Sequence, residues 1–72
     1  MNTITREKLL KAGFSEEIIN GNIIYTRKGF SILHNEFAWC PCIMMAGEMK
    51  IGNVYLDTME ELERFINETN NM

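Results

Sequence analysis

Residues 16–34, EEIINGNIIYTRKGFSILH, decide the fold. Asn20-Gly21 stands between two pairs of isoleucines, and Asn-Gly between apolar residues is the strongest short-range signal for a β-hairpin. Lys28-Gly29 repeats the arrangement eight residues later. Together the two turns predict three successive antiparallel strands. The competing interpretation is that Ser15 caps a helical turn, which leaves residues 15–19 as either a strand or a turn of helix.

Helices are predicted on both sides of this stretch. Thr5 is placed to cap a short helix over residues 5–12, and Gly13 follows where helices commonly end in a left-handed residue. Toward the C-terminus, Thr58 and Glu61 form a capping-box pattern. The residues after it place one apolar face at spacings of three and four: Met59, Leu62, Phe65, Ile66 and Thr69.

Two further turn signals complete the predicted sheet. Asn35-Glu36 marks a turn before the stretch 36–45, EFAWCPCIMM, and Gly47 marks another turn before a last strand, KIGNVYLD, at residues 50–57. The predicted fold is a single α+β domain over residues 1–72. It has a short N-terminal helix, a curled antiparallel meander of four to five short strands, and a C-terminal amphipathic helix packed on the sheet.

Size and charge restrict the partners. A chain of 72 residues is close to the lower limit for folding by core burial alone, so we expect a homo-oligomer. The net charge of −3 argues against binding to duplex nucleic acid, and binding of any nucleic acid would have to be salt-dependent. Neither a signal peptide nor a membrane span is recognisable, so we expect a cytoplasmic protein with reduced thiols and no cofactor.

Alternation in EFAWCPCIMM divides the strand into two sets. One set is bulky: Phe37, Trp39, Pro41 and Ile43. The other is small or soft: Ala38, Cys40, Cys42 and Met44. We expect the second set to pack beneath a helix and the Trp39 side to contact a partner. Pro41 lacks an N–H and belongs on an edge strand or at a bulge, and an open edge can pair with another chain. The alternative is that the sheet curls enough to bury both faces within one subunit.

A group of aromatic and cationic residues gathers on the outer surface if the strands pair in sequence order: Tyr25, Arg27, Lys28, His34, Trp39 and Lys50. Such side chains can stack on bases and hold phosphates. With Phe37 added and Lys28 set aside, they are our candidate ligand or interface residues. The simpler alternative is scattered polarity on a strand surface.

The two thiols offer a different hypothesis. Zinc takes four ligands, and Cys40, Cys42 and His34 supply three, so a complete site of thiolates would require two chains. Cysteines two apart in one strand are poorly placed for a disulfide. We therefore expect both thiols to be buried as small hydrophobes. The sequence shows no nucleophilic motif and no phosphate-binding glycine loop, so we expect no enzymatic activity.

Several segments resemble small accessory proteins carried by phages and mobile elements of gut bacteria: REKLLKAGF at 6–14, the NG…IYTRKGF hairpin, the Trp-bearing strand, and IGNVYLDTMEELERFI at 51–66. Several such proteins are counter-defence factors. The resemblance implies an oligomeric, non-enzymatic binding protein that either sequesters a nucleotide-type signal or blocks a host protein. The alternative function is a thiol-dependent metal-binding or redox protein.

Overall fold

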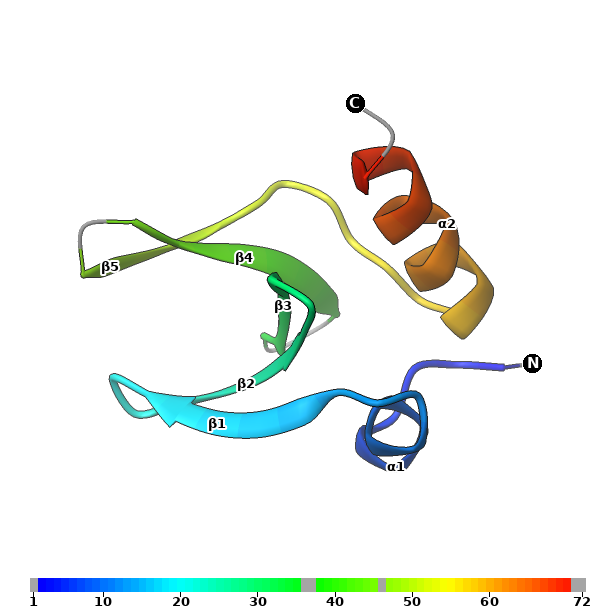
Figure 1. The fold of residues 1–72 in the computed structure, drawn as a ribbon, viewed down its shortest axis with the longest axis horizontal. Coiled ribbons are helices and arrows are strands. Elements are labelled where there is room, and N and C mark those ends of the chain that lie inside the picture. Colours follow the sequence, from blue (N-terminus) through cyan, green and yellow to red (C-terminus); the bar gives the residue numbers. More distant parts are fainter. Residues whose placement is uncertain (1, 36–37, 46, 71–72) are drawn as a thin grey trace.

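The computed structural model describes residues 2–35, 38–45 and 47–70. The five strands pair antiparallel in chain order, and both helices lie on one side of the curled sheet (Figure 1). The predicted α+β fold is therefore confirmed. The elements are α1 (Arg6–Lys11), β1 (Ser15–Ile19), β2 (Asn22–Arg27), β3 (Phe30–His34), β4 (Trp39–Met45), β5 (Glu48–Ile51) and α2 (Met59–Asn70).

Both predicted tight turns are present. Ile19 pairs with Asn22, so the loop is Asn20-Gly21, whose φ angles are 53° and 82°. The loop at Lys28-Gly29 has φ angles of 49° and 82°. Positive φ at both loop positions is the requirement of a type I′ hairpin turn, which asparagine and glycine meet most easily. Residues 15–19 are therefore a strand, and the helical-turn interpretation is wrong.

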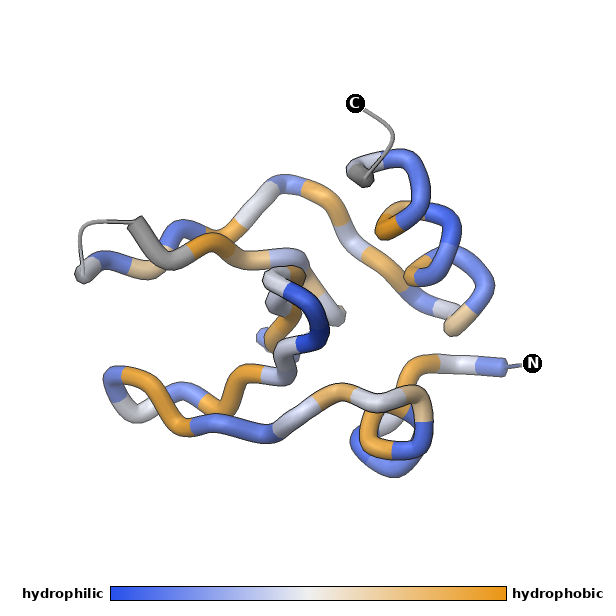
Figure 2. The backbone as a smooth tube through the Cα atoms, in the orientation of Figure 1, coloured by the Kyte–Doolittle hydropathy of each residue, from blue (hydrophilic) through white to orange (hydrophobic). Residues whose placement is uncertain are grey.

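The sheet buries apolar side chains on both faces. We call the larger group the helix-side cluster: Ile4, Leu9, Phe14, Tyr25, Ile32, Leu56, Leu62 and Ile66. The second group, the concave-side cluster, is Ile24, Leu33 and Cys42, with Ile19 and Met49 packed against it. Since Ile19 and Met49 come from opposite edge strands, the sheet must curl around this cluster. The alternative in which the sheet curls enough to bury both faces within one subunit thus describes this sheet. Figure 2 shows apolar stretches in the strands and on the side of α2 that faces the sheet.

The prediction about the two faces of the Trp39 strand is wrong. Tyr25 pairs with Ile32, and Ile32 with Pro41, so the bulky set of β4 shares the face covered by the helices. Leu33 pairs with Cys40, which puts the thiols on the concave face. The physical reason is the covering layer: the helices cover the aromatic rings of the helix-side cluster, whereas the concave-side cluster holds aliphatic side chains and a thiol.

The helices begin at the predicted caps. The Lys8 N–H donates to Thr5 Oγ1 at 3.2 Å. At α2, the Glu61 N–H donates to Thr58 Oγ1 and the Thr58 N–H donates to Glu61 Oε1, both at 3.2 Å, which completes the capping box. The two helix starts are joined, because the Ile4 N–H donates to the Asp57 carbonyl at 2.9 Å. Within the described residues, no helix is long and apolar enough to cross a membrane.

Pro41 lies in an interior strand, because β4 pairs with β3 on one side and β5 on the other. Its carbonyl accepts a hydrogen bond from the Gly52 N–H at 2.9 Å, and the next hydrogen bond along β4 runs from the Leu56 N–H to the Trp39 carbonyl. The step from Pro41 to Trp39 is two residues, whereas the step from Gly52 to Leu56 is four. The segment after β5 therefore bulges by two extra residues beside β4. Since the N and O of one strand residue point the same way, the missing N–H of Pro41 faces this bulge. The edge prediction for Pro41 is wrong, and the bulge alternative fits.

Candidate functional site

Three of the predicted site residues come together on the helix-side face. The Trp39 ring is in edge contact with Tyr25, at 5.6 Å between centroids, and with His34, at 4.8 Å. The Trp39 Nε1–H donates to the Ile4 carbonyl at 3.1 Å, which ties the half-buried indole into its own subunit. A hollow of about 310 Å³ lies against these rings. Phe37 is outside the described residues.

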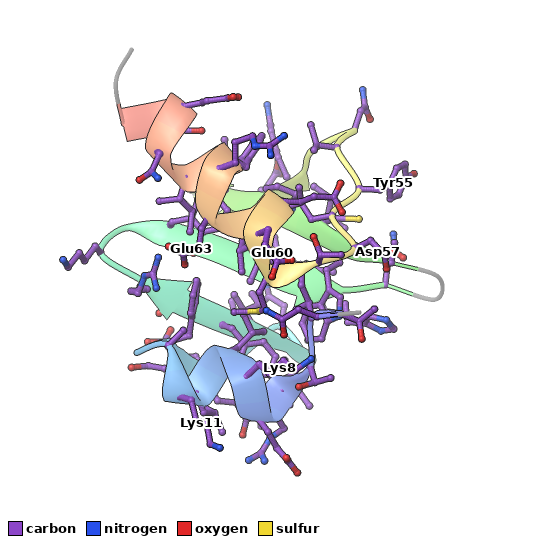
Figure 3. All side chains as sticks on the ribbon, turned by 90° about the vertical axis from the view of Figure 1, so that its right-hand side faces the viewer. Lys8, Lys11, Tyr55, Asp57, Glu60 and Glu63 are labelled. Carbon is purple, nitrogen blue, oxygen red and sulfur yellow. The ribbon has the colours of Figure 1, made fainter. Side chains whose placement is uncertain are left out.

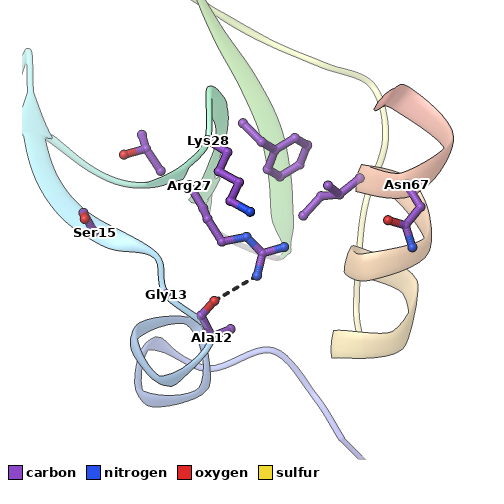
Figure 4. A pocket seen from close by; sticks show the side chains of 9 residues that line it. Ala12, Gly13, Ser15, Arg27, Lys28 and Asn67 are labelled. Atoms are coloured by element: carbon purple, nitrogen blue, oxygen red, sulfur yellow. Dashed lines mark hydrogen bonds between the residues drawn. The ribbon is translucent and has the colours of Figure 1, made fainter. Parts of the chain in front are cut away.

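Arg27 lies apart from this aromatic group and already has partners. Its guanidinium donates to Glu63 Oε1 at 2.8 Å and to the Ala12 carbonyl at 2.9 Å, and it stacks 4.6 Å from the centre of the Phe14 ring. Figure 4 shows it crossing a pocket of about 630 Å³ between α1, the β2–β3 turn and α2. These contacts make Arg27 a tie between three elements, which leaves little of its charge for a ligand.

The two thiols do not form a reactive site with His34. Cys40 and Cys42 are buried on the concave face. His34 is exposed on the helix side of the sheet, where it pairs with Trp39 across the strands. Burial raises the pKa of both thiols, and the neighbouring Cys40 adds to the rise for Cys42. A raised pKa reduces the thiolate that metals and oxidants need. Within the part of the chain that the structure describes, no three His, Cys, Asp or Glu side chains are grouped to hold a metal.

The remaining candidate, Lys50, lines a different site, which we call the apolar pocket. It has a volume of about 590 Å³ and lies between β3, β4, the end of β5 and the second half of α2. The apolar residues that line it are Phe30, Pro41, Ile43, Ile51, Val54 and Phe65. Ile51 pairs with Cys42, so its side chain lies on the concave face and only its main chain borders the pocket. Phe30 and Phe65 meet edge to face at 5.8 Å. Its polar lining residues include Lys50, Ser31 and Thr69.

Two aliphatic side chains of the apolar pocket are unusually open to solvent. Ile43 is 60% exposed and Val54 is 40% exposed. Isolated exposed hydrophobic residues are ordinary, but a group of them around one concavity marks a binding surface. Lys50 is the charged residue of the lining, and among the described residues it makes no ion pair.

Sequence reasoning missed this pocket because it treated residues 50–57 as a regular strand. In the structure β5 ends at Ile51, and the bulge that follows carries Val54 over the pocket and Tyr55 outward. Figure 3 shows Tyr55 projecting from this segment, and the ring is 65% exposed. The available signal was Gly52-Asn53, a turn-forming pair inside an apparent strand.

Comparisons with known proteins gave no match to a protein-family model, a curated protein or a solved structure. The resemblance to phage accessory proteins therefore stays a prediction from sequence motifs.

Proposed function

We propose that this chain is a small non-enzymatic binding protein, and that the apolar pocket takes a ligand with an apolar or aromatic body and one anionic group. The observation that carries the proposal is the combination, at one concavity, of exposed aliphatic side chains with Lys50, the one cation among the described lining residues.

The apolar walls supply the binding free energy in this proposal. A volume of about 590 Å³ lies within the usual range of roughly 300–1,000 Å³ for small-molecule sites. Covering an exposed aliphatic side chain completely gains about 1.5–3 kcal/mol, and Ile43 and Val54 each have part of this gain left to make. The edge-to-face pair of Phe30 and Phe65 gives a planar ring a surface to contact.

Lys50 supplies the preference for an anion. The chain as a whole is negative, so attraction for an anion must be local. The Lys50 ammonium group, which makes no ion pair with the residues that the structure describes, provides it at the pocket. A nucleotide-type signal is one member of this ligand class, with its base in the pocket and a phosphate at Lys50. Sequestering such a signal would give the counter-defence role that the resemblance implies.

The test is a titration with 8-anilinonaphthalene-1-sulfonate, an aromatic anion that fluoresces when its rings leave water. We expect saturable binding to the folded wild type, loss of binding in Ile43→Asp, and weaker binding in Lys50→Met. The matched control is Ile18→Asp, because Ile18 is 74% exposed on β1 and lies outside the apolar pocket. Circular dichroism checks that each variant is folded, since partly unfolded chains also bind this dye.

Equal dye binding by Ile43→Asp and Ile18→Asp would show that the apolar pocket is not the site. A second arm uses mononucleotides, cyclic nucleotides and an aromatic carboxylate as competitors of the dye. Displacement by nucleotides at lower concentration than by the carboxylate would support the nucleotide-type signal. Displacement by the carboxylate alone would keep the pocket and overturn that identification.

A further inference from the structure

The outer edge of β5 is open. β5 is the last strand of the sheet, and among the described residues no strand pairs with its outer side. The Gly52 N–H points to β4, and the pairing of β5 with β4 is regular from Ile51 back to Glu48. Main-chain N–H and C=O groups of successive strand residues point to alternate sides, so those of Lys50 and Glu48 also point to β4. The N–H and C=O groups of Met49 and Ile51 then face outward. An open edge of this kind is a template for another strand.

The sequence of this edge is complementary to itself. In an antiparallel pair of β5 strands related by a two-fold axis through Met49, Glu48 lies directly opposite Lys50 of the second copy, and Lys50 lies opposite Glu48 of the second copy. The two Met49 residues then exchange both main-chain hydrogen bonds, because their N–H and C=O groups face outward. Opposite charges directly across a pair of strands stabilise it.

Other registers of the same pair lose this complementarity. A two-fold axis through Glu48 opposes two glutamates, and an axis through Lys50 opposes two lysines. Like charges directly opposite destabilise a strand pair. The second open edge, β1, has the sequence SEEII and no cation, so no register of β1 with itself forms an opposite-charge pair. For two identical strands, charge therefore favours β5 over β1, and it favours the axis through Met49 over those through Glu48 and Lys50.

We infer that two copies of this chain associate through β5, antiparallel about Met49, to form one continuous sheet with two Glu48–Lys50 pairs across the joint. This inference does not rest on the proposed function, although Lys50 belongs to both sites. It places the oligomer contact at β5 instead of at the Trp39 strand. Pairing through one four-residue strand buries less than the roughly 1,200 Å² of a stable specific interface, so the dimer is weak and concentration-dependent.

The test measures sedimentation velocity of the full chain up to about 1 mM, where a dimer of this size should be populated. Glu48→Lys turns both charge pairs into lysine–lysine contacts, and Lys50→Glu turns both into glutamate–glutamate contacts. We expect each to raise the dissociation constant about tenfold or more. The exchange Glu48→Lys/Lys50→Glu restores both pairs with reversed polarity, so the double variant should dimerise as the wild type does.

Net charge provides the control. Glu48→Lys brings each copy closer to neutrality, so general repulsion would predict tighter association, whereas pairing through β5 predicts weaker association. Glu17→Lys makes the same change of charge on β1 and should leave the dimer intact. A monomeric wild type at 1 mM, equal effects of Glu17→Lys and Glu48→Lys, or failure of the double variant to recover would each overturn the inference. Glu48 does not line the apolar pocket, so Glu48→Lys should bind the dye normally and separate this test from that of the proposed function.

Discussion

The two faces of the sheet bury their apolar side chains by different means. The helix-side cluster joins residues far apart in the chain, such as Leu9 of α1 and Leu62 of α2, over Ile32 of β3. The concave-side cluster is built from the strands alone, because the curl brings the two edge strands onto the same residues. One sheet thus serves two clusters, which is how a 72-residue chain gains buried area without a further layer.

The difference shows which contacts hold the helices. α1 has six residues and α2 has twelve, and helices of such length are marginal in water by themselves. Their attachment depends on the helix-side cluster and on the Arg27 tie to Glu63 and Ala12. The concave-side cluster depends mostly on hairpins between neighbouring strands. Damage to the two clusters should therefore have unequal consequences.

The largest effect is expected from Leu62→Ala on the helix side. Leu62 is completely buried, and truncation of such a leucine costs about 2–5 kcal/mol. This is a large part of the roughly 5–15 kcal/mol that stabilises a typical domain. Urea unfolding followed by circular dichroism should show a greatly reduced midpoint. The control is Leu10→Ala, at a 37% exposed position of α1, which should lose little. Equal losses in the two variants would contradict the role of the helix-side cluster.

Local signals predicted most of the elements. The turn at Asn20-Gly21 and the capping box at Thr58 depend on residues within a few positions of each other, so their geometry is encoded locally. The buried state of Cys40 and Cys42 was also predicted, from their small apolar character.

The arrangement of the layers and the site could not be predicted in the same way. Alternation divides β4 into two sets of side chains, but it does not say which set the helices cover, because that depends on the curl of the whole sheet. The apolar pocket depends on the bulge after Ile51, which interrupts the strand pattern. The sequence pattern groups Lys50 with Tyr25, His34 and Trp39 in one candidate site. In the structure Lys50 lines the apolar pocket, whereas the other three line a separate hollow.

A smaller effect is expected from Cys40→Ala on the concave side. The change removes one sulfur atom and its hydrogen bond from Asn35 Nδ2, at 3.3 Å, so we expect a loss of about 1 kcal/mol in the free energy of unfolding. Dye binding should be unchanged, since Cys40 does not line the apolar pocket. Metal analysis of the purified wild type tests the thiol alternative directly. Stoichiometric metal that disappears in Cys40→Ala would replace our packing interpretation of the concave face.

The smallest effect concerns the polar border of the helix-side cluster. The Tyr25 hydroxyl donates to Glu16 Oε2 at 2.8 Å, and the Arg6 Nε–H donates to the same oxygen at 2.7 Å. These contacts join α1 and β1 to the buried ring of Tyr25. The hydrogen bond from Arg6, followed by the one from Tyr25, lowers the pKa of Glu16 below its ordinary value of 4.5. The Glu16 carboxylate is solvent-accessible, so its contribution to stability is small.

The sign of the pH dependence follows from the direction of this shift. A carboxyl group whose pKa is lower in the folded state stabilises the fold above pH 4.5, and the contribution disappears as the pH falls through the folded pKa. Glu16→Gln should therefore be less stable than the wild type at pH 7, and the difference should shrink as the pH falls through the folded pKa of Glu16. Glu17→Gln, on the other face of β1, leaves the contacts of Glu16 in place and should be as stable as the wild type at pH 7. A difference between Glu16→Gln and the wild type that persists unchanged at low pH would mean that packing, and not the charge of Glu16, joins α1 to the sheet.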